Sequence, residues 1–356
     1  MRLCRVVCCC GVLLVAATAA AQPLLPGRVA IEAVAAADGD FGSDVPRKAG
    51  VWLDLFTAVR LVEGLDVVAR PLITRRTFDG TWQRQLYQLG LRYERPGRVG
   101  LRVDAGQMPS PIGLALLENR ADLNPVISQH SAYYLPLPRV DPELPRTFLI
   151  AAAYPLGAQV TFSARGWDAR AAVTDSSPVR GRPFFGSNKP PRLRNTVVGF
   201  GITPRIGLRV GAAIAHGAYA SVDEVVDRSR GDRDATMVQF EAEWSFGGTR
   251  LAGEWVHSMM ETARTDAVAS GGWIQIMQTL TPRLFIAGRA DAQQFRFQRL
   301  AGVFGRERYD RYEAIAGFRV TPDITLRGGY MVRHGYVVFH WDDQIVVSVV
   351  WHRKLL

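Results

Sequence analysis

Apolar and polar residues alternate one by one in segment after segment of this chain, and no other feature constrains the fold as strongly. In 51–60, Val51, Leu53 and Leu55 fall on one side of the alternation, and Asp54 falls on the other. The same period of two recurs in other segments, including 98–106, 237–246 and 324–333. Successive side chains of a β-strand point to opposite faces, so these segments are predicted to be strands with one apolar face. After residue 21, no apolar run is long enough for a transmembrane helix.

The connections between the predicted strands alternate between short turns and longer polar loops. The short ones place Gly or Pro at turn positions, at 62–64, 95–97, 165–166, 203–205, 247–248, 281–283 and 321–323. The longer ones include 176–193, 217–234, 295–310 and 335–342. Counting between these joints gives about sixteen strands, with a range of about 14 to 18. Short periplasmic turns and long extracellular loops are typical of an all-β, transmembrane antiparallel β-barrel, which is the predicted fold.

The first residues are typical of an export signal. Two arginines precede a short apolar run at 6–17, and small residues follow at 18–21. We therefore predict a cleaved signal peptide at 1–21 and a single barrel domain at 22–356, located in the outer membrane of a Gram-negative-type bacterium. Cysteines occur only inside the predicted leader, at Cys4, Cys8, Cys9 and Cys10. The exported chain therefore cannot depend on disulfides.

The faces opposite the apolar ones carry many charges. The candidate pore-lining residues are Arg60, Arg70, Arg92, Arg102, Asp104, Arg170, Arg209, Glu241, Arg289, Arg319 and Arg327. A charge that faced lipid would cost about 2–4 kcal/mol at the bilayer midplane, so these residues are expected to face a hydrated lumen. Sixteen strands enclose a bore too wide for wall side chains to fill. The net charge of +10 permits anionic partners without choosing among them.

The third of the predicted long loops, 107–156, is longer than a surface connection needs, and such loops tend to be functional. Its charged residues Glu118, Arg120 and Asp122 are the candidate constriction residues. We expect the loop to fold into the bore, where these charges would filter solutes. Two alternatives are that it caps the outer mouth or packs against a neighbouring subunit.

The tryptophans fall near the predicted strand ends. Those expected at the outer membrane interface are Trp52, Trp82, Trp273 and Trp341, and those expected at the turn side are Trp167, Trp244 and Trp351. Amphipathic rings gather at the two interfaces of a membrane barrel, so the pattern predicts two aromatic girdles.

The start of the long loop is similar to the corresponding segment of phosphate-selective porins. The shared pattern comprises Gly106, Gln107, Pro111, Gly113 and Leu114, followed by the acidic residue Glu118. This resemblance implies an outer-membrane porin that assembles as a homotrimer, with arginines and lysines lining its pore for anions.

No sequence motif indicates catalysis. The chain lacks the G-x-S-x-G, H-E-x-x-H and phosphate-loop patterns, so no catalytic residue, metal site or cofactor is predicted. The basic segment around 180–194 is expected to contact lipopolysaccharide phosphate or anionic solutes rather than nucleic acid.

The expected function is a porin through which small hydrophilic solutes diffuse passively, with a preference for anions such as phosphate. The expected partners are those solutes, outer-membrane lipid and lipopolysaccharide. One alternative is a plugged structural or adhesive barrel whose loops bind partners, and a second is an outer-membrane hydrolase.

Overall fold

The computed structural model describes most of the chain after residue 27. The described residues are 28–42, 48–75, 81–113, 120–138, 146–151, 154–180, 194–225, 228–262, 265–300, 303–336 and 338–356. The predicted leader at 1–21 and most of the basic segment around 180–194 lie outside them.

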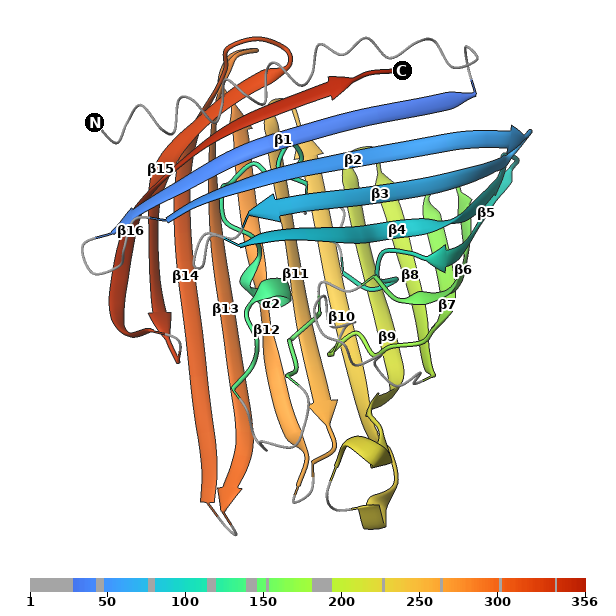
Figure 1. The fold of residues 1–356 in the computed structure, drawn as a ribbon, viewed down its shortest axis with the longest axis vertical. Coiled ribbons are helices and arrows are strands. Elements are labelled where there is room, and N and C mark those ends of the chain that lie inside the picture. Colours follow the sequence, from blue (N-terminus) through green and yellow to red (C-terminus); the bar gives the residue numbers. More distant parts are fainter. Residues whose placement is uncertain are drawn as a thin grey trace.

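Sixteen strands form one closed antiparallel β-barrel, as the alternation predicts (Figure 1). Each strand pairs with its neighbours in sequence, and β1 pairs with β16 to close the ring. The strands are β1 (Val29–Gly42), β2 (Lys48–Val62), β3 (Leu65–Arg75), β4 (Trp82–Arg95), β5 (Val99–Gln107), β6 (Leu156–Ala164), β7 (Trp167–Thr174), β8 (Asn195–Arg205), β9 (Leu208–Ala220), β10 (Arg233–Phe246), β11 (Thr249–Met260), β12 (Ala267–Thr279), β13 (Leu284–Leu300), β14 (Val303–Arg319), β15 (Ile324–Gly335) and β16 (Val338–Lys354).

In the part of the chain that the structure describes, three short helices lie in connections between strands. They are α2 (Ser131–Tyr134), η2 (Val222–Glu224) and η3 (Arg228–Arg230). Among the described residues, no helix is long and apolar enough to cross a membrane.

Short turns join alternate strand pairs at one end of the barrel, where β1 begins and β16 ends. Gly64, Gly166 and Gly247 adopt positive φ in three of these turns, which glycine does without steric cost. The turn predicted at 203–205 comes slightly later in the chain. Strand β8 continues to Arg205, and Gly207 makes the turn with φ of 85°.

The prediction of long loops at 295–310 and 335–342 is wrong. Strands β13 and β14 continue through most of 295–310, and β16 begins within 335–342. In β13, Phe295 and Phe297 keep their rings buried inside the barrel while Arg296 points outward. The alternation therefore continues, but the charged outward residues gave it the composition of a loop.

The outward faces of the strands form an apolar surface. Large exposed side chains recur around the ring, among them Leu89, Phe200, Ile274, Tyr312 and Ile345. A contiguous apolar surface of this extent is unfavourable in water and matches the lipid-facing band of a transmembrane β-barrel.

Two of the tryptophans predicted in the outer girdle point inward instead. Trp273 is 4% exposed, and its indole N–H donates to Glu254 at 3.1 Å. Trp52 donates in the same way to Asp38 at 3.0 Å. The prediction was wrong here because a carboxylate inside the barrel satisfies each indole N–H, which lets the ring pack on the inner face.

Candidate functional site

The eleven candidate pore-lining residues lie on inward-facing strand positions, where buried and exposed residues alternate. In β13, for example, Arg289 and Asp291 are 3% and 2% exposed, whereas Ile286 on the outward face is 47% exposed. The structure therefore brings these charges together inside one ring. Whether they contact solutes depends on what covers each of them.

Near the short-turn end the inner wall is open to water. The side chains of Arg60, Glu94 and Arg102 are 56%, 52% and 41% exposed. Arg60 pairs with Asp66 at 3.0 Å, and Arg92 and Arg102 both pair with Asp104, at 2.9 and 2.7 Å. This part of the lumen is a hydrated vestibule with paired charges on its wall.

A second network crosses four strands further around the ring. Arg209 on β9 pairs with Asp168 on β7 at 3.0 Å and with Glu241 on β10 at 2.5 Å. Arg170 on β7 lies 3.6 Å from the same Glu241. The two arginines and two carboxylates balance one another, so this wall carries little net charge.

Two other candidates lie in different surroundings. Arg70 is 7% exposed and is held by Asp54 at 2.5 Å, with its guanidinium over the ring of Tyr87. Arg319 lies beside a short turn, where it donates to the carbonyl of Pro282 and packs over Phe285.

The long connection between β5 and β6 runs into the barrel. Its helix α2 contacts β12 and β13 inside the ring (Figure 1). The connection spans 108–155, of which 108–113, 120–138, 146–151 and 154–155 are described. Tyr133 of α2 is 1% exposed, and its hydroxyl donates to Glu254 on β11 at 2.6 Å.

Four charged side chains on β13 and β14 hold this loop. We call them the anchor cluster: Arg289, Asp291, Arg311 and Glu313. Arg289 pairs with Asp291 at 3.0 Å and lies 3.6 Å from Glu313. The side chains of all three residues are fully buried.

The anchor cluster both donates hydrogen bonds to the loop backbone and accepts hydrogen bonds from it. Arg289 donates to the carbonyl of Ser128 at 2.8 Å, and Arg311 donates to the carbonyl of Gln129. Glu313 accepts the N–H of Ile127 at 2.9 Å, and Asp291 accepts the N–H of Ser131 at 3.0 Å. Because loop backbone saturates these charges, they position the loop instead of facing open water.

Arg327 on β15 has a similar position under the loop. Its Nη1 donates to the carbonyls of Ala121, Asn124 and Val126 at 3.1, 2.6 and 3.0 Å. The candidate constriction residues Arg120 and Asp122 pair with each other at 2.8 Å, and Arg120 also reaches Glu32 on β1 at 2.9 Å. The third candidate, Glu118, lies outside the described residues.

A buried histidine lies between the loop and this wall. His130 is 1% exposed and packs against Trp273 with ring centroids 4.4 Å apart. Burial lowers the pKa of His130 well below its ordinary value, and the positive charge of Arg289 acts in the same direction. His130 is therefore neutral at pH 7.

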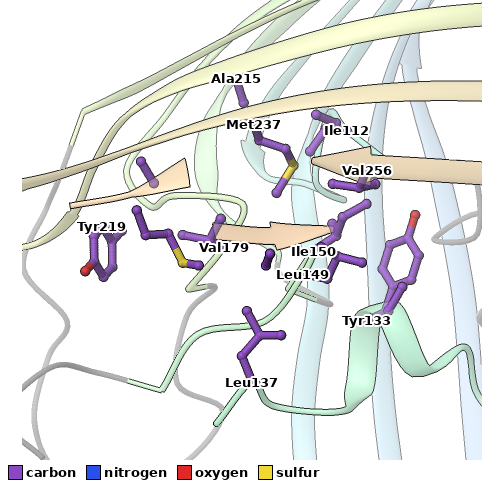
Figure 2. Packing of buried hydrophobic residues seen from close by; sticks show 14 of the residues in the cluster. Ile112, Tyr133, Leu137, Leu149, Ile150, Val179, Ala215, Tyr219, Met237 and Val256 are labelled. Atoms are coloured by element: carbon purple, nitrogen blue, oxygen red, sulfur yellow. The ribbon is translucent and has the colours of Figure 1, made fainter. Parts of the chain in front are cut away.

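An apolar cluster fills the space between the loop and β7–β13 (Figure 2). Ile112, Leu149 and Ile150 of the loop pack there against Met237 and Val256 of the wall, all 2% exposed or less. The inner positions of β8–β12 in this region are mostly small or apolar. Strand alternation missed this wall because both faces of these strands are apolar here. The inward alanines Ala213 and Ala215 were the available signal.

On the opposite side, a narrow cavity separates the loop from β1–β4. It is lined by Asp38, Trp52, Asp54 and Tyr87 of the wall and by Ala121, Asn124, Gln129 and Tyr134 of the loop, among others. Its volume of about 20 Å³ holds about one water molecule. The loop thus closes one half of the cross-section with apolar packing and leaves a narrow space with both polar and apolar lining in the other half.

Exposed basic residues gather at the short-turn end. They are Arg28, Arg95, Arg98, Arg165, Arg205, Arg283, Arg353 and Lys354. The acidic residues in the same turns are fewer, with Glu63 and Asp323 the examples between strands. This mouth of the barrel therefore has a positive potential that attracts anions.

No protein-family model matches the sequence, and no curated protein matches it. In structure, the outer membrane channel DcaP of Acinetobacter baumannii matches with a TM-score of 0.59 at 10% identity, over 94% of this chain and 100% of that chain. The trimer form of OmpT, an outer membrane protein of Vibrio cholerae, gives 0.58 at 8% identity over 91% and 99%. An anion-selective porin from Comamonas acidovorans gives 0.57 at 9% identity over 91% and 99%.

The chain has a porin-like fold. At these identities the similarity establishes architecture alone, and the resemblance to phosphate-selective porins stays a prediction.

Proposed function

We propose that this protein is an outer-membrane channel for the passive diffusion of small hydrophilic solutes. The observation that carries the proposal is the asymmetric lumen. The inner wall at the short-turn end is open, with the side chain of Arg102 41% exposed, whereas the space beside the loop is narrow. The apolar outer face supports placement in a membrane, and the anchored loop supplies the constriction.

The proposed channel prefers anions modestly. The basic mouth raises the local concentration of anions, whereas paired charges on the inner wall limit discrimination further in. The structural similarity to an anion-selective porin is consistent with this preference. We extend the proposal to anions as a class, with phosphate as one member.

The proposal includes export by the predicted leader, residence in the outer membrane with lipopolysaccharide around the barrel, and assembly as a homotrimer. Two structural neighbours bear on the last two points, one described as an outer membrane channel and one as a trimer form. It assigns no catalytic residue.

A second candidate is a plugged barrel whose loops bind partners. The apolar cluster favours it, because Ile112, Leu149 and Ile150 close half of the interior. Conduction separates the two candidates, since only the first requires an open path.

The basic mouth provides the test of ion preference. In a planar lipid bilayer with a KCl gradient, the protein should give discrete current steps. The sign of the reversal potential should show that chloride is more permeant than potassium. Changing Arg95, Arg98, Arg165 and Arg205 together to glutamate should lower the anion-to-cation permeability ratio roughly twofold or more. Lysine at the same four positions keeps the charge and serves as the matched control.

An unchanged reversal potential in the glutamate variant would show that the basic mouth does not set ion preference. Folded protein that gives no current steps would favour the plugged barrel.

A further inference from the structure

The outer surface of β11–β14 contains a groove of about 490 Å³, which falls within the ~300–1,000 Å³ range of small-molecule sites. Small residues form its floor, including Ser270, Gly272, Ala290 and Ala292. Trp255, Ile274 and Tyr312 border it, and their side chains are 46%, 55% and 49% exposed. The groove is therefore apolar and open to whatever surrounds the barrel.

Arg306 lines one end of the groove, and its register partner on the neighbouring strand is a second arginine, Arg296. Arg296 on β13 is paired in register with Arg306 on β14, and both are exposed on the outward face. Like charges directly opposite on antiparallel strands repel each other. Among the residues that the structure describes, neither arginine has a carboxylate partner, whereas the neighbouring Arg308 pairs with Asp310 at 2.7 Å. An anion bound between Arg296 and Arg306 would relieve this repulsion.

The arginine pair also lies at a suitable depth for a lipid headgroup. Along the outward face of β13, Leu284, Ile286, Ala290 and Ala292 are apolar, and the polar residues begin at Gln294. At about 3.3 Å per residue and a tilt of about 40°, Arg296 lies about 30 Å from the start of the strand. That distance places it just beyond an apolar band about 25 Å tall, on the long-loop side.

We propose that this surface binds a membrane lipid that carries phosphate on its headgroup, with Arg296 and Arg306 on the phosphate and an acyl chain in the groove. Guanidinium groups bind phosphate oxygens through paired hydrogen bonds, which suits two arginines on adjacent strands. The inference rests on the membrane placement of the proposed function. With the long loops on the outer side of the outer membrane, Arg296 and Arg306 lie at the outer leaflet. The matching lipid there is the phosphorylated lipid portion of lipopolysaccharide.

The test measures lipid binding to the detergent-solubilised full-length protein by native mass spectrometry. The probes are lipid A with both phosphates, the same lipid without phosphate, and inorganic phosphate. The protein should bind phosphorylated lipid A at least about tenfold more tightly than the dephosphorylated form, with no displacement by equimolar inorganic phosphate. Changing Arg296 and Arg306 together to glutamine should remove most of this preference. Glutamine at Arg95 and Arg98, two exposed arginines at the other end, should leave it intact.

A second variant, Ala292→Trp, fills the groove from an exposed position and should weaken binding of both lipids. Three results would overturn the proposal: undiminished lipid binding by the arginine variant, equal binding of inorganic phosphate, or a changed oligomeric state of Ala292→Trp with unchanged lipid binding. The last result would assign the surface to contact between copies of the chain. Single-channel recording on the same preparations reports on the channel separately, so the two proposals can fail independently.

Discussion

Replacing Arg289 with methionine is expected to lower the free energy of unfolding of the barrel by about 3–5 kcal/mol. Methionine approximates the length of the side chain but removes the charge that Asp291 and Glu313 share, and all three side chains are fully buried. Asp291 would keep Arg311 at 3.0 Å, but Glu313 would lose its arginine, so the buried cluster would hold one uncompensated negative charge beneath the loop. The measurement is the urea midpoint of the folded fraction, resolved by electrophoretic mobility without heating.

The matched control is Arg60→Met, which removes an arginine from another strand pair. Its side chain is 56% exposed and pairs with Asp66 in water, so only a small change is expected. Equal midpoints for the two variants would show that the anchor cluster does not hold the loop.

Modifying a cysteine at position 121 should reduce the single-channel current by about half or more, because Ala121 lines the narrow cavity. The variant Ala121→Cys is made in a chain whose four native cysteines are changed to serine, so that one thiol reacts. A small charged methanethiosulfonate reagent is added to the bathing solution during recording. The added group is larger than the space beside Ala121, so it would block the path proposed there.

Ala132→Cys provides the matched control on the same loop. Ala132 is 1% exposed in the apolar cluster, so its thiol should react slowly and leave the current unchanged. Current loss at position 132 without loss at position 121 would place the conducting path on the β7–β13 side instead.

Strand alternation and turn chemistry were sufficient to predict the barrel. A period of two shows which residues share a face, and glycine or proline marks where a strand reverses. The errors in the predicted ends of β13 and β14 have a physical cause. Beyond Gln294 the outward residues of β13 and β14 become charged, yet the strands continue because Phe295 and Phe297 still pack inward.

The contacts inside the barrel could not be predicted in the same way. Alternation places Asp168, Arg209 and Glu241 on inner faces, but only the register across four strands brings them within hydrogen-bond distance. The inward position of Trp273 depends on Glu254, its register partner on the neighbouring strand β11, and only the strand register brings the two together.

The loop shows the same limit more strongly. Its length indicated a functional segment, whereas its path depends on contacts with residues more than 150 positions away, such as Ile127 with Glu313. Without that pairing, Arg289 and Arg327 look like free charges on the lumen wall. With it, they are positioning residues for the constriction.

Solute entry into liposomes tests most directly whether this barrel conducts. The full-length protein is refolded into vesicles, which are then diluted into isotonic solutions of uncharged sugars of increasing size, and swelling is followed by light scattering. We predict swelling that is fastest for the smallest solute, slower as solute size increases and absent for dextran, because the loop narrows the lumen. Vesicles that contain folded protein but swell no faster than empty ones would contradict this prediction.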